Sequence, residues 1–154
     1  MNPKKPRKRI RVNVGDVFAV PPDKSELAFG YVRTYQYPDV AILPFISKGR
    51  ILRECELPTL ESFMDVLTIR TAIERCDWPR IASFPFPNEE STWAPPRRQL
   101  STIRPDVRLV VVKGNFIPSK EYGEWDSLPE LIKANIDQLK ALILTSAPEF
   151  QMIT

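Results

Sequence analysis

Two short apolar stretches near the start of the chain constrain its fold more than any other feature. Residues 14–21 read Val-Gly-Asp-Val-Phe-Ala-Val-Pro, and residues 28–33 read Ala-Phe-Gly-Tyr-Val-Arg. The first is typical of a strand that begins at a Gly-Asp turn and ends at Pro21 and Pro22, because proline fixes φ and lacks a backbone donor. The second contains Gly30, a residue that allows a strand to bend or another segment to approach closely. We therefore expect two neighbouring antiparallel strands in a small, bent sheet.

Apolar runs and turn residues extend this prediction. They indicate strands over 16–20, 29–37 and 40–47, with a hairpin turn at Tyr37-Pro38-Asp39. A further buried strand is expected over 107–112. The intervening stretch 88–105 is polar and rich in proline and shows no periodicity, which predicts a long surface loop.

Two helices are expected. Thr59 is suited to cap a short helix over 59–67, in which Leu60, Phe63, Met64 and Leu67 share one face. The β-branched residues of 68–73 then predict a return to strand.

The second predicted helix is longer and closes the chain. Ser127 and Glu130 form a capping-box pattern around Pro129, which predicts a helix from there to Leu144. One apolar stripe is expected to pack on the sheet, and it consists of Leu128, Leu131, Ile132, Ile136, Leu139, Leu142 and Ile143. The chain is thus predicted to be an α+β protein: a bent, mainly antiparallel sheet of SH3-like or half-barrel character, with one short helix and a C-terminal helix.

Charge is concentrated at the beginning of the chain. The formal net charge is +3, but no acidic residue precedes Asp16, while six basic residues do: Lys4, Lys5, Arg7, Lys8, Arg9 and Arg11. Without them, 16 basic residues remain against 19 acidic ones, so the rest of the chain is mildly acidic. We therefore divide the chain into a basic, flexible tail over 1–11 and one domain over 12–154. The tail either is simply solvated or binds phosphates.

The composition argues against several kinds of chemistry. The chain has no histidine, the commonest general base and metal ligand, and only two cysteines. We expect no metal, no cofactor and no disulfide, with Cys55 and Cys76 reduced and at least one of them packed as a small apolar group. Neither a signal peptide nor an apolar run of about 18 residues is visible, so a cytoplasmic protein without membrane contact is expected.

The two opening stretches also resemble a known family. The phrase Gly-Asp-Val-Phe-Ala-Val-Pro followed by Phe-Gly-Tyr-Val, with Gly15, Asp16, Phe18 and Gly30, resembles the opening of bacterial immunity protein family 26. Trp78, which precedes an apolar strand with a proline-rich exit at 84–87, resembles the same family. The resemblance covers the first third of the chain and the region 78–87.

This resemblance implies a function in binding. Members of the family protect bacteria from polymorphic toxins, so the chain is expected to be an antitoxin that binds and neutralises a cognate toxin without turnover. The motif residues are expected to serve the fold, because binding surfaces of such proteins differ between members. Two alternatives remain open: a small hydrolase similar to phosphotriesterases, which the absence of histidine disfavours, and a nucleic-acid-binding module that uses the basic tail.

The toxin-binding residues are expected in polar, aromatic and irregular segments. Tryptophan and tyrosine supply much of the affinity of protein interfaces, and acidic residues speed association with the basic clefts of nucleases. Two loops combine these residue types, and their candidates are Glu89, Glu90 and Trp93 in the first and Glu121, Tyr122, Glu124, Trp125 and Asp126 in the second. The alternative for each tryptophan is that it closes an end of the sheet.

Overall fold

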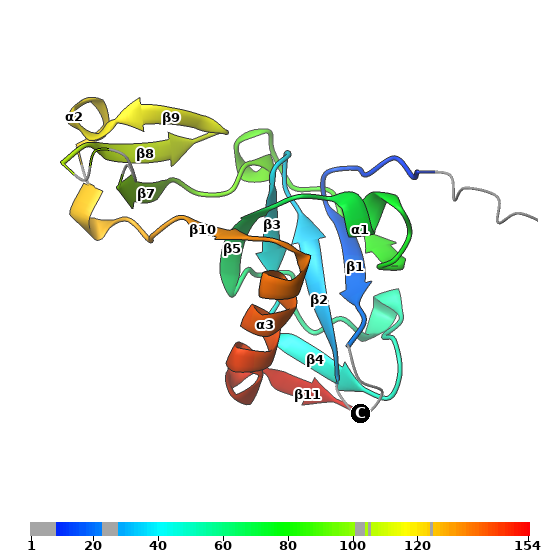
Figure 1. Cartoon of the computed structure of the whole chain (residues 1–154). Coiled ribbons are helices and arrows are strands. Elements are labelled where there is room, and N and C mark those ends of the chain that lie inside the picture. The colour runs from blue at the N-terminus through cyan, green and yellow to red at the C-terminus, as the bar shows by residue number, and fades with distance from the viewer. Residues whose placement is uncertain (1–8, 23–27, 101–103, 105, 124) are drawn as a thin grey trace, which may run out of the picture.

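The computed structural model describes the chain except for residues 1–8, 23–27, 101–103, 105 and 124. The described residues form eleven strands in two sheets, with three helices, of which the longest, α3 (Ile136–Ser146), packs on the larger sheet (Figure 1). The predicted α+β class is confirmed. Within this described part, no helix has the length and apolar character needed to cross a bilayer.

The larger sheet is mainly antiparallel. Its main strand order in the described residues is β10-β5-β3-β2-β1-β6, in which β10 runs parallel to β5 and the other neighbours are antiparallel. Outside this order, β4 (Phe45–Lys48) and β11 (Gln151–Ile153) run parallel to each other and extend the sheet from the start of β2. The strands of the main order are β1 (Asp16–Val20), β2 (Ala28–Thr34), β3 (Asp39–Ile42), β5 (Met64–Thr68), β6 (Arg80–Ser83) and β10 (Ile132–Ala134).

Strand β2 changes partner along its length, and this bends the sheet. Residues 28 and 29 pair with β4, whereas residues 32–34 pair with β3. Gly30 lies between the two pairings, and a Cβ atom at this position would lie 2.8 Å from two side-chain carbons of Ile143 in α3. The missing side chain therefore lets the helix approach the strand where the strand bends.

We expect Gly30→Ala to destabilise the protein by about 1–3 kcal/mol, the usual cost of overpacking a core. Urea denaturation measures this loss. In the double variant Gly30→Ala/Ile143→Ala, the new methyl group would occupy space that the shorter helix side chain leaves, so the two losses should be less than additive. Additive losses would contradict the contact.

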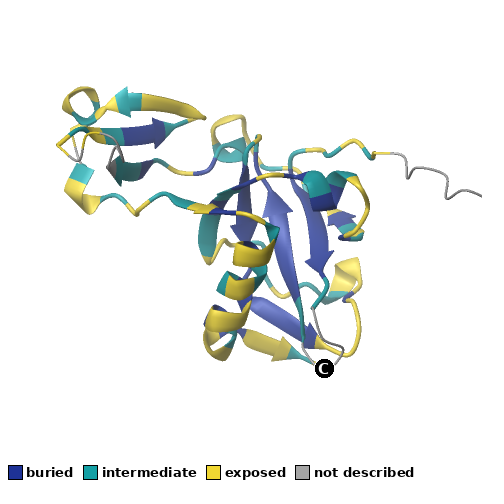
Figure 2. Cartoon of the chain, viewed as in Figure 1, coloured by how far each residue is buried: buried dark blue, intermediate teal, exposed yellow. Residues whose placement is uncertain are grey.

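Both faces of the larger sheet are covered. Along β1, Phe18 and Val20 point into the core beneath α3, while Val17 and Ala19 point into a second core on the opposite face. Leu52, from the connection between β4 and β5, contributes to that second core. Figure 2 shows the resulting band of buried strands, which explains why these strands are apolar at successive positions.

The C-terminal helix begins later than predicted. Asn135 caps it: its side chain accepts a hydrogen bond from the backbone of Gln138, whose side chain accepts one from the backbone of Asn135. The predicted cap, Ser127, ends a 3-10 turn instead, because the backbone of residues 129–131 pairs with Arg98. From the predicted stripe, Leu139 and Ile143 are buried on the sheet.

The predicted order of helix and strand in the middle of the chain is wrong. The helix expected over 59–67 is replaced by β5, and the strand expected over 68–73 is replaced by a short helix, α1 (Thr71–Glu74). Val66 and Thr68 are buried from β5, which is the alternation of a strand, whereas the spacing of Leu60, Phe63, Met64 and Leu67 fits a helix. Pairing with β3 and β10 decides between them, since it satisfies the backbone of β5 on both edges.

The predicted long loop also contains regular structure. Its last part is β7 (Arg97–Leu100), which pairs with β8 (Arg108–Val112), the strand expected over 107–112. With β9 (Asn115–Pro118) these strands form a separate sheet, which α2 (Ser119–Tyr122) follows. The described residues of 97–122 project from the larger sheet and are called the arm below (Figure 1).

Several predicted boundaries also differ. The strand expected over 29–37 ends at Thr34, and the one expected over 40–47 is split into β3 and β4. Ile10, inside the predicted tail, packs against the core and donates a backbone hydrogen bond to Glu74. Both cysteines are free but exposed, so the prediction that one is packed is wrong.

Candidate binding site between the sheet and the arm

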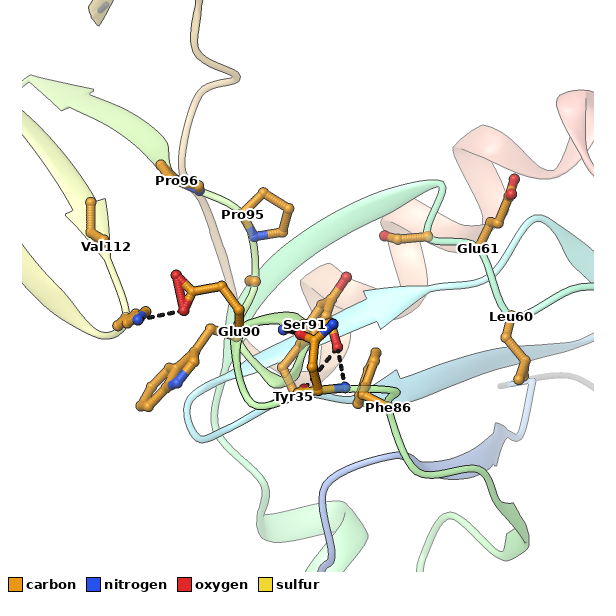
Figure 3. Close-up of a pocket in the computed structure, with 14 residues that line it drawn as sticks. Tyr35, Leu60, Glu61, Phe86, Glu90, Ser91, Pro95, Pro96 and Val112 are labelled. Carbon is orange, nitrogen blue, oxygen red and sulfur yellow. Dashed lines mark hydrogen bonds and ion pairs between the residues drawn. The ribbon is translucent and has the colours of Figure 1, made fainter. Parts of the chain in front are cut away.

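A pocket of about 650 Å³ lies where the arm meets the larger sheet (Figure 3). Its floor belongs to the sheet face opposite α3. Tyr35 lies four residues after Tyr31 along β2 and its extension, so both side chains point to the same face, and Tyr31 belongs to the second core. One wall is the chain from 86 to 96, and the other two are the segment 60–62 and the β8–β9 turn of the arm. Much of the lining consists of rings, namely those of Tyr35, Phe86, Trp93, Pro95 and Pro96.

Tyr35 is held in the floor by hydrogen bonding. Its side chain is 7% exposed, and its hydroxyl donates to Oδ1 of Asp65 at 2.9 Å. Ser62 donates to the same oxygen at 2.6 Å. Burial, and then the nearby Asp65 carboxylate, raises the pKa of Tyr35 above its ordinary value. The phenol is therefore a neutral, immobilised donor and not a candidate base.

Phe86 is held between the side chains of Arg33, in β2, and Tyr35, which directly follows β2. Its ring stacks on Tyr35 with centroids 5.5 Å apart and an interplanar angle of 15°. The guanidinium of Arg33 lies 3.7 Å from its centroid and donates to the carbonyl of Phe84. Burial lowers the pKa of Arg33 from its ordinary value. These contacts fix the proline-rich segment 84–87 against the sheet.

The rim of the pocket is charged. Glu90 forms an ion pair with Lys113 of the β8–β9 turn at 2.5 Å, which links the body to the arm. Glu61 is exposed on the facing wall, and Glu89 is exposed next to Glu90. The ring-lined interior therefore opens between carboxylates.

The base of the arm is anchored by a second, buried ion pair. Nη1 of Arg97, at the start of β7, lies 2.8 Å from Oδ1 of Asp39, and both side chains are 3% exposed. Arg70 is also buried, and its guanidinium donates to the backbone carbonyls of Tyr35 and Asp39. Asp39 thus pairs with Arg97 through its carboxylate and accepts from Arg70 through its backbone carbonyl.

The first group of predicted site residues lies together at this pocket. Glu90 and Trp93 line it, and Glu89 immediately precedes the 3-10 turn Glu90–Thr92 that carries them. Trp93 is partly exposed and lies beside Gly114 of the arm, where a Cβ atom would be 3.8 Å from its ring.

The second group lies at the other end of β8. Trp125 donates its indole N–H to the carbonyl of Leu109 at 3.0 Å, and its ring lies between the guanidinium groups of Arg98 and Arg108, 5.2 and 4.8 Å from the centroid. Glu121 and Tyr122 are in α2, Asp126 is exposed, and Glu124 lies outside the described residues. The structure therefore does not bring the two groups into one site.

The residues that carry the family resemblance are all buried. A Cβ atom at Gly15, whose φ is +95°, would clash with the backbone of Phe84. Asp16 accepts hydrogen bonds from Asn13 and Arg80. Phe18 and Trp78 belong to the core beneath α3, as does the contact at Gly30. A partner cannot reach these side chains in the folded protein.

The pocket offers chemistry suited to binding. Its side-chain polar groups are carboxylates, hydroxyls, the carboxamide of Asn88, the indole N–H of Trp93 and the ammonium group of Lys113, and the chain has no histidine to move a proton between them. Among the described residues, no three His, Cys, Asp or Glu side chains are grouped to hold a metal ion. No protein-family model, curated protein or solved structure matches the chain.

Several residues of this site were not predicted. Tyr35, Phe86, Lys113 and Glu61 come from four separate segments, and only the tertiary structure brings them together. The proline-rich stretch 84–87 was the available signal, because aromatic residues between prolines cannot be buried in a regular central strand.

Proposed function

We propose that this protein is an antitoxin that binds and neutralises a cognate bacterial toxin through the pocket between the sheet and the arm. The observation that carries the proposal is a rigid, ring-lined pocket whose rim bears carboxylates. Tyr35 and Phe86 are held in place before any partner arrives, so binding costs little side-chain entropy. Such aromatic anchors supply a large share of interface affinity.

The acidic rim favours a basic partner. Glu61 and Glu90 line the opening, the exposed Glu89 precedes Glu90 in the chain, and Lys113 pairs only with Glu90. A toxin that cleaves nucleic acid presents a basic cleft, and opposite charges accelerate association. The same carboxylates disfavour a phosphate-bearing ligand in the pocket, which counts against nucleic acid there. The absence of histidine disfavours the hydrolase alternative, and the Ser62 hydroxyl shares its carboxylate acceptor on Asp65 with Tyr35.

The second predicted group extends this surface along the arm. Strand β8 has five residues, a length of about 17 Å, and a standard interface is wide enough to cover both of its ends. Contact of the toxin with Tyr122, Trp125 and Asp126 therefore stays a prediction, which Trp125→Ala tests in the binding assay below by weakening binding if the contact exists.

Binding to the toxin domain encoded beside this protein tests the proposal. Trp93→Ala should weaken binding by about 2 kcal/mol or more, mainly through faster dissociation, because it removes a ring from the pocket. The double variant Glu89→Lys/Glu90→Lys should mainly slow association. Surface plasmon resonance separates the two rates, and growth of cells that express the toxin reports protection.

Phe116→Ala is the matched control, since Phe116 is 49% exposed on β9 and does not line the pocket. It should bind like the wild type. Wild-type affinity of all pocket variants would place the interface elsewhere, and failure of the wild-type protein to bind its neighbouring toxin would overturn the assignment for that pair.

A further inference from the structure

We infer that the pocket takes an extended, proline-containing segment of the partner that has a lysine or arginine beside it. This inference rests on the proposed function and names the part of the toxin that enters the pocket. Three properties of the pocket support it: the rings that line it, the engagement of its polar groups, and the charge of its rim.

The rings form a preorganised surface for proline. Tyr35 and Phe86 are stacked 5.5 Å apart and Arg33 lies over the Phe86 ring, so this fixed stack presents ring edges, while Trp93 and Pro95 line the same space and are less buried than Tyr35. Grooves between fixed aromatic rings are the sites at which proteins bind proline-rich segments, because the flat pyrrolidine ring packs on an aromatic face. The polyproline II conformation also exists before binding, so the segment loses little entropy.

The interior offers few acceptors to an ordinary peptide. The hydroxyl of Tyr35 and that of Ser62 both donate to Asp65, and the hydroxyl of Ser91 donates to the carbonyl of Asn88. A backbone N–H that entered among the rings could bond only to a remaining lone pair of these hydroxyls, and anywhere else it would lose its water without gaining a partner. Proline has no backbone N–H, so it can be buried there without this loss.

The rim selects a neighbouring cation. Among the described residues, Glu61 and Glu89 form no ion pair, and the carboxyl side chain of Glu90 remains 73% exposed beside Lys113. A lysine or arginine next to the proline would place its charge between these carboxylates while its methylene groups cover the rings. The charge of the rim thus determines which proline-containing segments bind.

The experiment uses three synthetic peptides as probes and the ¹⁵N-labelled protein. The first has the sequence Ala-Pro-Pro-Leu-Pro-Pro-Arg-Lys, the second has alanine at every proline, and the third has glutamate at both basic positions. We expect the first to shift the resonances of Tyr35, Phe86 and the Trp93 indole N–H, and to bind about tenfold more tightly than either of the others. Trp93→Ala should weaken it by about tenfold, whereas Phe116→Ala should not change it.

Three results would overturn the inference. The first is that the alanine peptide binds as tightly as the proline peptide, which would show that charge alone attracts it. The second is that the proline peptide shifts only resonances of residues outside the pocket. The third is that the proline peptide does not bind. A chain that lacks residues 1–8 is also compared, because these residues contain Pro3, Pro6 and four basic side chains. If the deletion raises peptide affinity by about tenfold or more, the chain's own N-terminal segment occupies the pocket and the assignment to a partner is overturned.

The toxin distinguishes this inference from the proposed function. If the toxin domain binds and the first peptide displaces it, the inference is supported. If the toxin domain binds but a saturating concentration of the peptide does not displace it, the inference fails and the antitoxin function stands. If the peptide binds and the toxin domain does not, the antitoxin function fails for that toxin.

Discussion

Replacing Asp39 with alanine is expected to destabilise the protein by about 3–5 kcal/mol, the usual cost of removing one partner of a buried ion pair. Asp39 and Arg97 are almost completely buried 2.8 Å apart, and Arg70 lies buried beside them. Without the carboxylate, the buried guanidinium of Arg97 would lose its ion-pair partner, and Arg70 would keep only its bonds to backbone carbonyls and the more distant charge of Glu74. Urea denaturation followed by circular dichroism measures the loss.

The double variant Asp39→Leu/Arg97→Met is the control for this prediction. Apolar residues of similar size often replace a buried ion pair at no cost in stability, so this variant should be clearly more stable than Asp39→Ala. Equal losses in both variants would show that the site tolerates no repacking and that charge is not the cause. Because Arg97 begins the arm, Asp39→Ala should also weaken binding of the toxin domain to the pocket.

Leu139→Ala is expected to cost about 2–5 kcal/mol, since it removes a fully buried side chain and leaves a cavity. Leu139 is 0% exposed, and it lies in the core with Phe18 and Val32 of the sheet. Leu144→Ala, five residues further along the same helix, is the matched control because Leu144 is 45% exposed. That substitution should stay within about 0.5 kcal/mol of the wild type.

The comparison of these two variants tests how α3 is oriented. Both replace leucine with alanine in one helix, so differences in helix propensity cancel. An unchanged denaturation midpoint for Leu139→Ala would mean that this face of the helix does not pack on the sheet. A large loss for Leu144→Ala would mean that the opposite face is buried.

Local pattern was sufficient where chain geometry depends on a few residues. The Gly-Asp turn and Pro21 mark the two ends of β1, as predicted. The apolar run over 107–112 forms β8 except for its first residue. Gly30 marks the bend of β2 and the approach of α3, because no other residue leaves room for Ile143. Local pattern failed over 59–73, where the spacing of apolar residues fits helix and strand alike and the neighbouring strands decide.

The residues of the candidate site also fall into those that local sequence predicted and those that it did not. Glu89, Glu90 and Trp93 were predictable because they are neighbours in a polar, irregular segment that must lie at the surface. Tyr35 and Phe86 were not, since 51 residues separate them and their stacking depends on how the segment 84–87 crosses the sheet. Trp125 was predicted from the same cues as Trp93, yet its indole N–H is bonded to β8 and its ring lies between two arginines.

Local sequence was enough to predict the α+β class, the bent sheet near the start of the chain, and the burial of Leu139 and Ile143 on the C-terminal helix, although not where that helix begins. These features follow from turn residues, prolines and the spacing of apolar side chains, which act within a few residues of the chain. Only the tertiary structure decided that β5 is a strand, that the arm exists, and that a pocket lies beside it. Each of these depends on backbone pairing and on charges that meet across long separations, such as Asp39 with Arg97 and Glu90 with Lys113. No local pattern records such partners, because their energy arises only when the chain is folded.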